Sequence, residues 1–158
     1  DLLSAPLSQV QKAVAQVVAI EAPLHVTDLV TRVAGMWGAR VGTRIRARVM
    51  DALEASAPQV SVQGEFVAQP GAAVAVRSRA GTHIPPERVP PEEYRQAILT
   101  VLETGQGFSR EQLTNEVRAL LGFGRATEPL HQAVEAQVSA LLSEGRLGEG
   151  SAGLTLRQ

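Results

Sequence analysis

Apolar residues in the first half of the chain recur every three or four positions in three segments, which is the spacing of one face of an α-helix. The segments run from about Ser8 to Ile20, from about residue 27 to 37, and from Gly42-Thr43 onward. Ser8 and Thr27 are predicted N-caps, and Gly38 is expected to end the second helix. The residues predicted to face inward are Val10, Ala13, Val14, Val17, Val18, Leu29, Val30, Val33, Met36, Ile45, Val49, Ala52 and Leu53.

Shorter extended segments accompany these helices. Residues 22–26 contain Pro23, which disfavours helix, and are predicted to form a short extended piece. Residues 60–62 and 66–68 alternate on either side of Gly64, which is typical of a β-hairpin. The predicted order is therefore helix, short strand, helix, helix and two-stranded hairpin.

The second half of the chain repeats this order about 84 residues later. Superposed pairs include Val10 and Tyr94, Val14 and Ile98, Leu29 and Leu113, Val33 and Val117, and, after one inserted residue, Val49 and Val134. Pro91 is expected to open a helix, Ser109 with Gln112 resembles a capping box, and residues 146–156 read as a glycine-rich hairpin. The predicted fold class is mainly α with small β-hairpins, arranged as tandem winged-helix repeats (helix-turn-helix plus wing). A single all-α bundle is the alternative.

This interpretation divides the chain into a first winged-helix domain at 1–69, a joint containing Pro and Gly at 70–90, and a second winged-helix domain at 91–158. Val74 and Val76 alternate within the joint, so this pair is expected to add a strand to the first wing or to pack across both domains. Partial order is expected here, because a structureless segment of this length is unusual in a compact protein.

Composition narrows the class of protein. The chain has 158 residues, of which 44% are hydrophobic and 20% charged, as in soluble globular proteins. It contains no cysteine, which excludes a disulfide framework, a thiolate zinc site and a cysteine nucleophile. A cytoplasmic location without membrane association is expected. Asp1-Leu2-Leu3-Ser4 lacks an initiator Met and the pattern of a signal peptide, so we expect a fragment of a larger protein.

Candidate catalytic chemistry is sparse. His25, His83 and His131 do not stand at metal-ligand spacing, and no Gly-x-Ser-x-Gly motif occurs. The glycine-rich segments lack the Lys-Ser/Thr of a phosphate-binding loop. We therefore expect no catalytic residue, no metal site, no cofactor and no small-molecule ligand in this fragment.

An arginine cluster is the one local signal for nucleic acid. Five arginines and no acidic residue lie between Asp28 and Asp51. The predicted nucleic-acid-binding residues are Arg40, Arg44, Arg46 and Arg48, with Arg77 and Arg79 assisting from beyond the wing. Arginine suits bidentate contacts to phosphate and guanine. The alternative is a solvated face with salt bridges to Asp28, Asp51 and Glu54.

The charge differs between the halves. The formal charge is +2 up to Pro90, from nine basic and seven acidic residues, and −3 from Pro91, from six basic and nine acidic residues. The third helix of the second copy carries Glu128 and Glu135, which phosphate would repel. DNA is therefore assigned to the first domain, and the second domain is expected to contact the rest of a parent chain or another protein.

An uncharacterised bacterial domain is similar to most of the chain, from about Val10 to Leu147. The resemblance is carried by residues 24–34, 42–49, 83–87 and 108–123. That domain stands at the C-terminus of large superfamily 1 DNA helicase-like proteins, which often contain a restriction-endonuclease-like nuclease domain. The resemblance implies a DNA-processing or defence context, with ATP hydrolysis and nuclease chemistry elsewhere in the parent protein.

The two function hypotheses belong to different classes. The first is a non-catalytic, accessory DNA-binding module of a helicase or nuclease. The alternative is a scaffold for protein interaction or dimerisation without DNA contact, with an apolar surface around Met36, Trp37 and Phe123.

Overall fold

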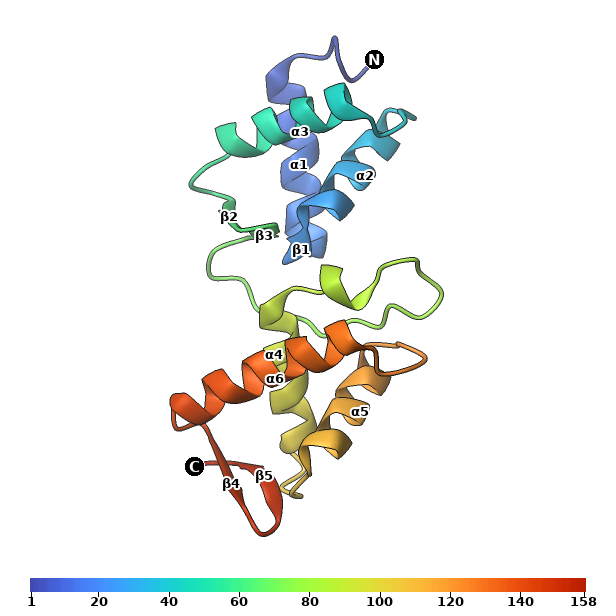
Figure 1. Ribbon diagram of the computed structural model, residues 1–158. Helices are drawn as coiled ribbons and strands as arrows, with labels where there is room; N and C mark the ends of the chain where they lie inside the picture. The colour runs from blue at the N-terminus through green and yellow to red at the C-terminus, as the bar shows by residue number, and fades with distance from the viewer. The chain divides into compact units, whose positions relative to one another are not determined.

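The computed structural model describes residues 1–158 and divides them into two compact units, Asp1–Ala73 (unit 1) and Val74–Gln158 (unit 2) (Figure 1). The fold is mainly helical, with small antiparallel β-hairpins. None of its helices is both long and apolar enough to cross a lipid bilayer.

Unit 1 contains three helices and one small sheet. Its elements are α1 (Leu7–Glu21), β1 (Leu24–His25), α2 (Val26–Met36), α3 (Thr43–Ala55), β2 (Ser61–Gln63) and β3 (Phe66–Ala68). The predicted hairpin is confirmed, because β2 pairs with β3 in antiparallel register and Val62 lies opposite Val67. The short strand β1 joins the other edge of β3, with Leu24 opposite Val67. The hairpin is thereby attached to the N-terminus of α2.

The core of unit 1 follows the predicted spacing, with one exception. Val14, Leu29 and Val49 are fully buried, as are most of the other predicted inward-facing residues. Met36 was predicted to face inward, but it is 52% exposed. It is the last residue of α2, where the helix axis has already passed the core.

Two predicted N-caps are wrong. The first helix begins at Leu7 after Pro6, so Ser8 lies within the helix and caps nothing. At α2 the cap is His25, whose Nδ1 accepts the backbone N–H of Thr27 at 3.0 Å. An imidazole nitrogen can satisfy a first-turn amide as a hydroxyl would, and His25 is also anchored in the strand β1.

Unit 2 repeats the order of elements. It contains the 3-10 helix η1 (Pro86–Arg88), α4 (Pro91–Leu102), α5 (Arg110–Leu120), α6 (Glu128–Ser143), β4 (Leu147–Gly150) and β5 (Gly153–Leu156). The predicted capping box at Ser109 and Gln112 is confirmed in both directions. The second hairpin is also confirmed, and an isolated bridge from Phe108 to Leu154 takes the place that β1 has in unit 1.

The repeated apolar positions are buried in both units. Val10, Val14 and Val49 are 0% exposed, and their counterparts Tyr94, Ile98 and Val134 are at most 1% exposed. The two cores are separate clusters, each formed within its own unit. The two units are therefore similar in the packing of their apolar residues as well as in sequence pattern.

Residues 74–85 fold with unit 2. Val76 packs against the core of that unit, and neither Val74 nor Val76 belongs to a strand, so the expected extension of the first sheet is wrong. The backbone N–H of Arg79 donates to the carbonyl of Leu121 at 2.8 Å. Most of the predicted joint is thus held by unit 2, and only a short stretch before Val74 precedes it.

Candidate nucleic-acid interface

Three of the predicted arginines form an exposed, unpaired group in unit 1. Arg40 lies in the turn before α3, and Arg44 and Arg46 lie in the first turn of that helix. All three are exposed, and none of their side chains makes a hydrogen bond or an ion pair within the chain. These cations are therefore available to an external anion. We call Arg40, Arg44 and Arg46 the arginine surface.

The burial of α3 explains why this surface faces outward. Ile45 and Val49 lie on the packed side of the helix, and Ile45 separates Arg44 from Arg46 in sequence. At 100° per residue, the two arginines flank the buried side on opposite edges. Packing of the apolar face therefore fixes where both guanidinium groups emerge.

The N-terminal end of α3 adds to the positive potential. Its N-cap is Gly42, no side chain caps the helix, and the first turn contains no acidic residue. Unsatisfied N–H groups and the helix dipole give such an end a partial positive charge. Asp51 and Glu54 lie further along α3, are exposed, and form no ion pair with the arginine surface. The salt-bridged alternative for these three arginines is therefore absent from the structure.

Arg48 has a different role from the one predicted. Its Nη2 atom donates to the backbone carbonyl of Ala5 at 2.8 Å, and the residue is partly buried. This contact ties α3 to the N-terminal turn, in which Leu2 is 0% exposed. Arg48 is thus engaged in holding unit 1 together.

Arg79 is also engaged internally, and within unit 2. Its side chain is 11% exposed and forms a forked ion pair with Glu93, which is 2% exposed; the Nη2 to Oε1 distance is 2.8 Å. The backbone N–H of Arg77 donates to Oε2 of the same carboxylate at 3.0 Å. The expectation that Arg79 follows the wing and reaches phosphate does not fit this geometry. Arg77 is exposed but belongs to the same unit.

The sequence interpretation missed the role of Glu93. It assigned Glu92 and Glu93 to the first turn of a helix, where acidic side chains offset the helix dipole. A signal was present in the spacing, since Glu93 lies four positions before the buried Ala97 and therefore on the same face of α4.

The counterpart of α3 in unit 2 is α6, which carries no arginine or lysine, and two half-exposed arginines of α4 and α5 pair with acids around it. Arg110 lies between two carboxylates, with 2.6 Å from Nη1 to Glu135 and 2.8 Å from Nη2 to Glu149. The hydrogen bond from Arg110 lowers the pKa of Glu149 below its usual range. Arg95 pairs in the same way with Glu144 and lowers the pKa of that carboxyl. The surface around α6 is therefore mixed in charge, unlike the arginine surface.

The net charges of the units differ less than the split at Pro90 suggested. With the boundary at Val74, unit 1 has six basic and six acidic residues, a net charge of zero, and unit 2 has nine basic and ten acidic, a net charge of −1. Arg77, Arg79, Arg88 and Glu87 together account for the difference of two charges, since all four fall in unit 2. Unit 1 as a whole therefore carries no net charge, and its positive charge is concentrated at the arginine surface.

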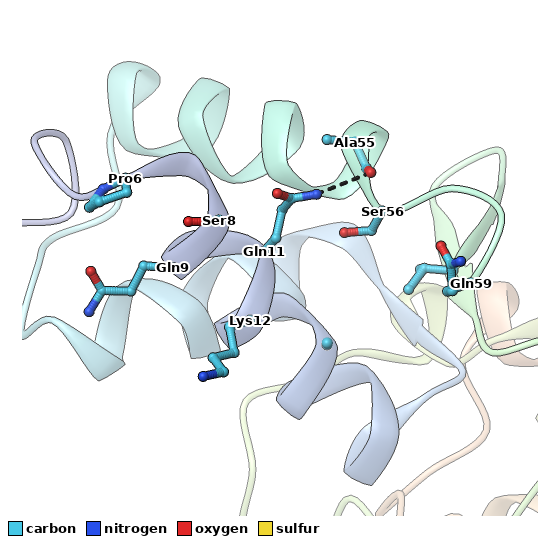
Figure 2. A pocket seen from close by; sticks show the side chains of 10 residues that line it. Pro6, Ser8, Gln9, Gln11, Lys12, Ala55, Ser56 and Gln59 are labelled. Carbon is cyan, nitrogen blue, oxygen red and sulfur yellow. Dashed lines mark hydrogen bonds between the residues drawn. The ribbon is translucent and has the colours of Figure 1, made fainter.

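A groove lined mostly by uncharged residues lies along α1 of unit 1. It measures about 830 Å³ and runs between α1 and the end of α3 (Figure 2). Gln11 crosses it and donates to the carbonyl of Ala55 at 3.1 Å. Lys12 is the one charged residue of its lining, which is completed by Pro6, Ser8, Gln9, Ala15, Ser56, Gln59 and Val60. The groove presents amides and small side chains, and holds no nucleophile paired with a base.

The histidines do not assemble into a metal site. No group of three or more His, Cys, Asp or Glu side chains is placed to hold a metal ion. His25 is buried, stacks edge-on against Phe66, and lies 3.2 Å from Glu65 through Nε2. Because Nδ1 accepts the N–H of Thr27, Nε2 carries the proton and donates to Glu65. This arrangement fastens the hairpin to the start of α2.

By fold and site, the chain is a mainly helical protein of two units with an exposed cationic surface on the first. Residues 1–47 are similar to a family whose model is described as a protein of unknown function (DUF3320). The match covers 47 of the 158 residues and includes Arg40, Arg44 and Arg46. No curated protein and no solved structure matches the chain.

Proposed function

We propose that unit 1 is a winged-helix module that binds the phosphate backbone of DNA, and that unit 2 has the same winged-helix architecture. Each unit has a helix, a short extended piece, two further helices and a terminal hairpin. That order matches a helix-turn-helix followed by a wing. In such proteins the second helix of the motif is the one that enters the major groove, and in unit 1 that helix is α3.

The observation that carries the proposal is the arginine surface. Arg40, Arg44 and Arg46 are exposed and unpaired, and they lie at the start of α3. Recognition helices contact DNA mainly through their N-terminal residues. Three free guanidinium groups at that end suit phosphate contacts, whereas Arg48 and Arg79 are left out because they are engaged inside the chain.

The wider role proposed is that of a non-catalytic accessory module in a larger DNA-processing or defence protein. Support comes from the resemblance to the C-terminal domain of helicase-like proteins. The family match over residues 1–47 has no assigned function and leaves this context open. Unit 2 is proposed to contact the rest of the parent chain or another protein, since the cations around α6 are already paired with Glu135, Glu144 and Glu149.

A salt titration tests the proposal. Each phosphate contact contributes about 0.9 to the slope of log affinity against log salt on duplex DNA. Three contacts predict a slope of roughly −2.7, and the double variant Arg44→Ala/Arg46→Ala should make it shallower by about 1.8. The measurement is fluorescence anisotropy of a labelled duplex with the full chain at several salt concentrations.

The matched control is Arg125→Ala. Arg125 is exposed and unpaired like the arginine surface, but it belongs to unit 2. Its replacement removes one charge and is expected to leave the slope unchanged. An unaltered affinity and slope in Arg44→Ala/Arg46→Ala would refute DNA binding by unit 1, and a shallower slope in Arg125→Ala would refute the assignment to that unit alone.

A further inference from the structure

A second concave feature of unit 1 shares Gln9 and Lys12 with the groove along α1. It is a hollow of about 320 Å³ between α1 and the C-terminal end of α2, lined by Gln9, Lys12, Ala13, Gln16, Met36 and Trp37. Its volume is at the lower end of the range of small-molecule sites. Trp37 is followed after three residues by Arg40, so the hollow and the arginine surface share one connecting turn.

Trp37 forms a fixed aromatic wall of this hollow. It is half-buried, packs against the core of unit 1, and its backbone N–H is bonded to the last turn of α2. The indole is thereby held in place without being enclosed. Met36 beside it is 52% exposed, although it is a large apolar residue. Folding of unit 1 leaves this apolar wall open to solvent.

The opposite wall consists of polar residues of α1 that have no partners. Gln9, Lys12 and Gln16 are exposed, and none of their side chains makes a hydrogen bond or an ion pair in the chain. Lys12 is also the only lysine of the protein. Figure 2 shows Gln11 turned toward Ala55, whereas Gln9 and Lys12 point away from it. No acidic residue lines the hollow.

An aromatic face, two free amides and one cation match the parts of a nucleotide. Single-stranded nucleic acids are bound by stacking of bases on aromatic side chains beside a positively charged path for the backbone. A glutamine amide can pair with the edge of a base, most readily adenine. Lys12, which lines the hollow, supplies charge complementary to phosphate, and Arg40 follows Trp37 three positions later in the chain.

We propose that this hollow binds one nucleotide of a single-stranded nucleic acid. The base stacks on Trp37, Gln9 and Gln16 contact its edge, and Lys12 contacts its phosphate. The inference rests on the proposed function, because it extends the arginine surface by a single-strand contact. The substrate class is therefore a junction between duplex and single strand. The duplex would contact Arg44 and Arg46, and the unpaired nucleotide would contact Trp37.

The fluorescence of Trp37 reports directly on this site, because it is the only tryptophan of the chain. We expect quenching when single-stranded DNA or RNA of one sequence is added to the full chain, and little quenching with a blunt duplex. Loss of one stacked base is worth roughly a 5- to 150-fold change in affinity. Trp37→Leu is expected to lose that factor for single strands in an anisotropy assay, while duplex affinity stays unchanged.

Gln16→Ala and Lys12→Ala keep the test independent of folding, since both residues are exposed. Each is expected to weaken binding of single strands, and Gln59→Ala, an exposed glutamine of the other groove, is expected to have no effect. Equal affinities in Gln16→Ala, Lys12→Ala and Gln59→Ala would overturn the inference. A comparison of DNA with RNA distinguishes the two sources of the nucleotide.

The outcomes separate this inference from the proposed function. Duplex binding that depends on Arg44 and Arg46, without quenching by single strands, refutes the hollow and leaves the DNA-binding module. Quenching by single strands without duplex binding supports the hollow and refutes the module. Absence of both refutes both.

Discussion

The ion pair between Arg79 and Glu93 yields the sharpest prediction on stability. The carboxylate of Glu93 accepts hydrogen bonds from both Nη atoms of Arg79 and from the backbone N–H of Arg77. The side chain of Arg79 is 11% exposed and that of Glu93 is 2% exposed. Removing one partner of a buried pair leaves the other charge uncompensated and costs about 3–5 kcal/mol. Glu93→Ala should therefore destabilise unit 2 by about that amount, a large fraction of the 5–15 kcal/mol typical of whole proteins.

The assay can resolve the units because each carries its own probe. Trp37 is the only tryptophan and lies in unit 1, whereas Tyr94 is the only tyrosine and lies in unit 2. In urea unfolding of the full chain, Glu93→Ala is expected to move the transition followed by near-ultraviolet circular dichroism of Tyr94. The transition followed by Trp37 fluorescence should not move.

Two control variants define what would refute the reasoning. Arg95→Ala breaks the ion pair between Arg95, whose side chain is 26% exposed, and Glu144, whose side chain is 46% exposed. Because the pair is exposed to solvent, its loss is expected to lower the stability by at most about 1 kcal/mol. Arg79→Leu/Glu93→Leu removes both buried charges and should restore most of the stability. If Glu93→Ala costs no more than Arg95→Ala, or if the double variant is as unstable as the single one, the pair does not hold residues 74–85 to unit 2.

Two further predictions concern the same unit. Burial raises the pKa of Tyr94 above its usual value, although Arg79 opposes this, and its hydroxyl donates to the carbonyl of Pro86 at 2.8 Å. A raised pKa in the folded state means that the stabilisation is complete below the ordinary tyrosine pKa of about 10 and is lost as the pH rises above it. Unit 2 should therefore weaken above that pH, and this alkaline loss should be absent in Tyr94→Phe when urea midpoints are compared. Gly122 has a φ of +78°, and a Cβ there would lie 2.2 Å from Ser78 Oγ, so Gly122→Ala should cost at least about 1–3 kcal/mol by urea unfolding. Gly124→Ala, which meets nothing within 4 Å, is its control, and equal midpoints for the two variants would contradict the argument.

Local patterns predicted the helices and hairpins because these depend on neighbours in sequence. Alternation around Gly64 was sufficient for the first hairpin, and Ser109 with Gln112 was sufficient for the capping box. The repeat helped further, since an apolar position supported in both copies, such as Val49 and Val134, is buried in both. These features follow from short-range rules that a single sequence contains.

The candidate site was predicted less completely. Which arginines bind a partner inside the chain depends on contacts between distant residues, and the spacing of residues in the sequence does not reveal them. Arg44 and Arg48 lie on the same edge of α3, yet Arg48 reaches a carbonyl 43 residues away and Arg44 stays free. Arg79 finds Glu93 only because residues 74–85 fold back onto unit 2. The hollow at Trp37 was missed for a related reason, since two of its walls come from different helices.

The comparison of the two units gives a physical reason to assign them different partners. At the third helix of unit 1, Arg44 and Arg46 are exposed and form no ion pair with an acid. Beside the third helix of unit 2, Arg110 at the start of α5 is bound between Glu135 of α6 and Glu149 of β4, and a phosphate would have to displace a charge-assisted hydrogen bond before it could bind there. Both units keep the same buried apolar positions, whereas the charged side chains around their third helices differ. Divergence of this kind leaves the packing of a repeated unit intact and fits the proposal that the two units have different partners.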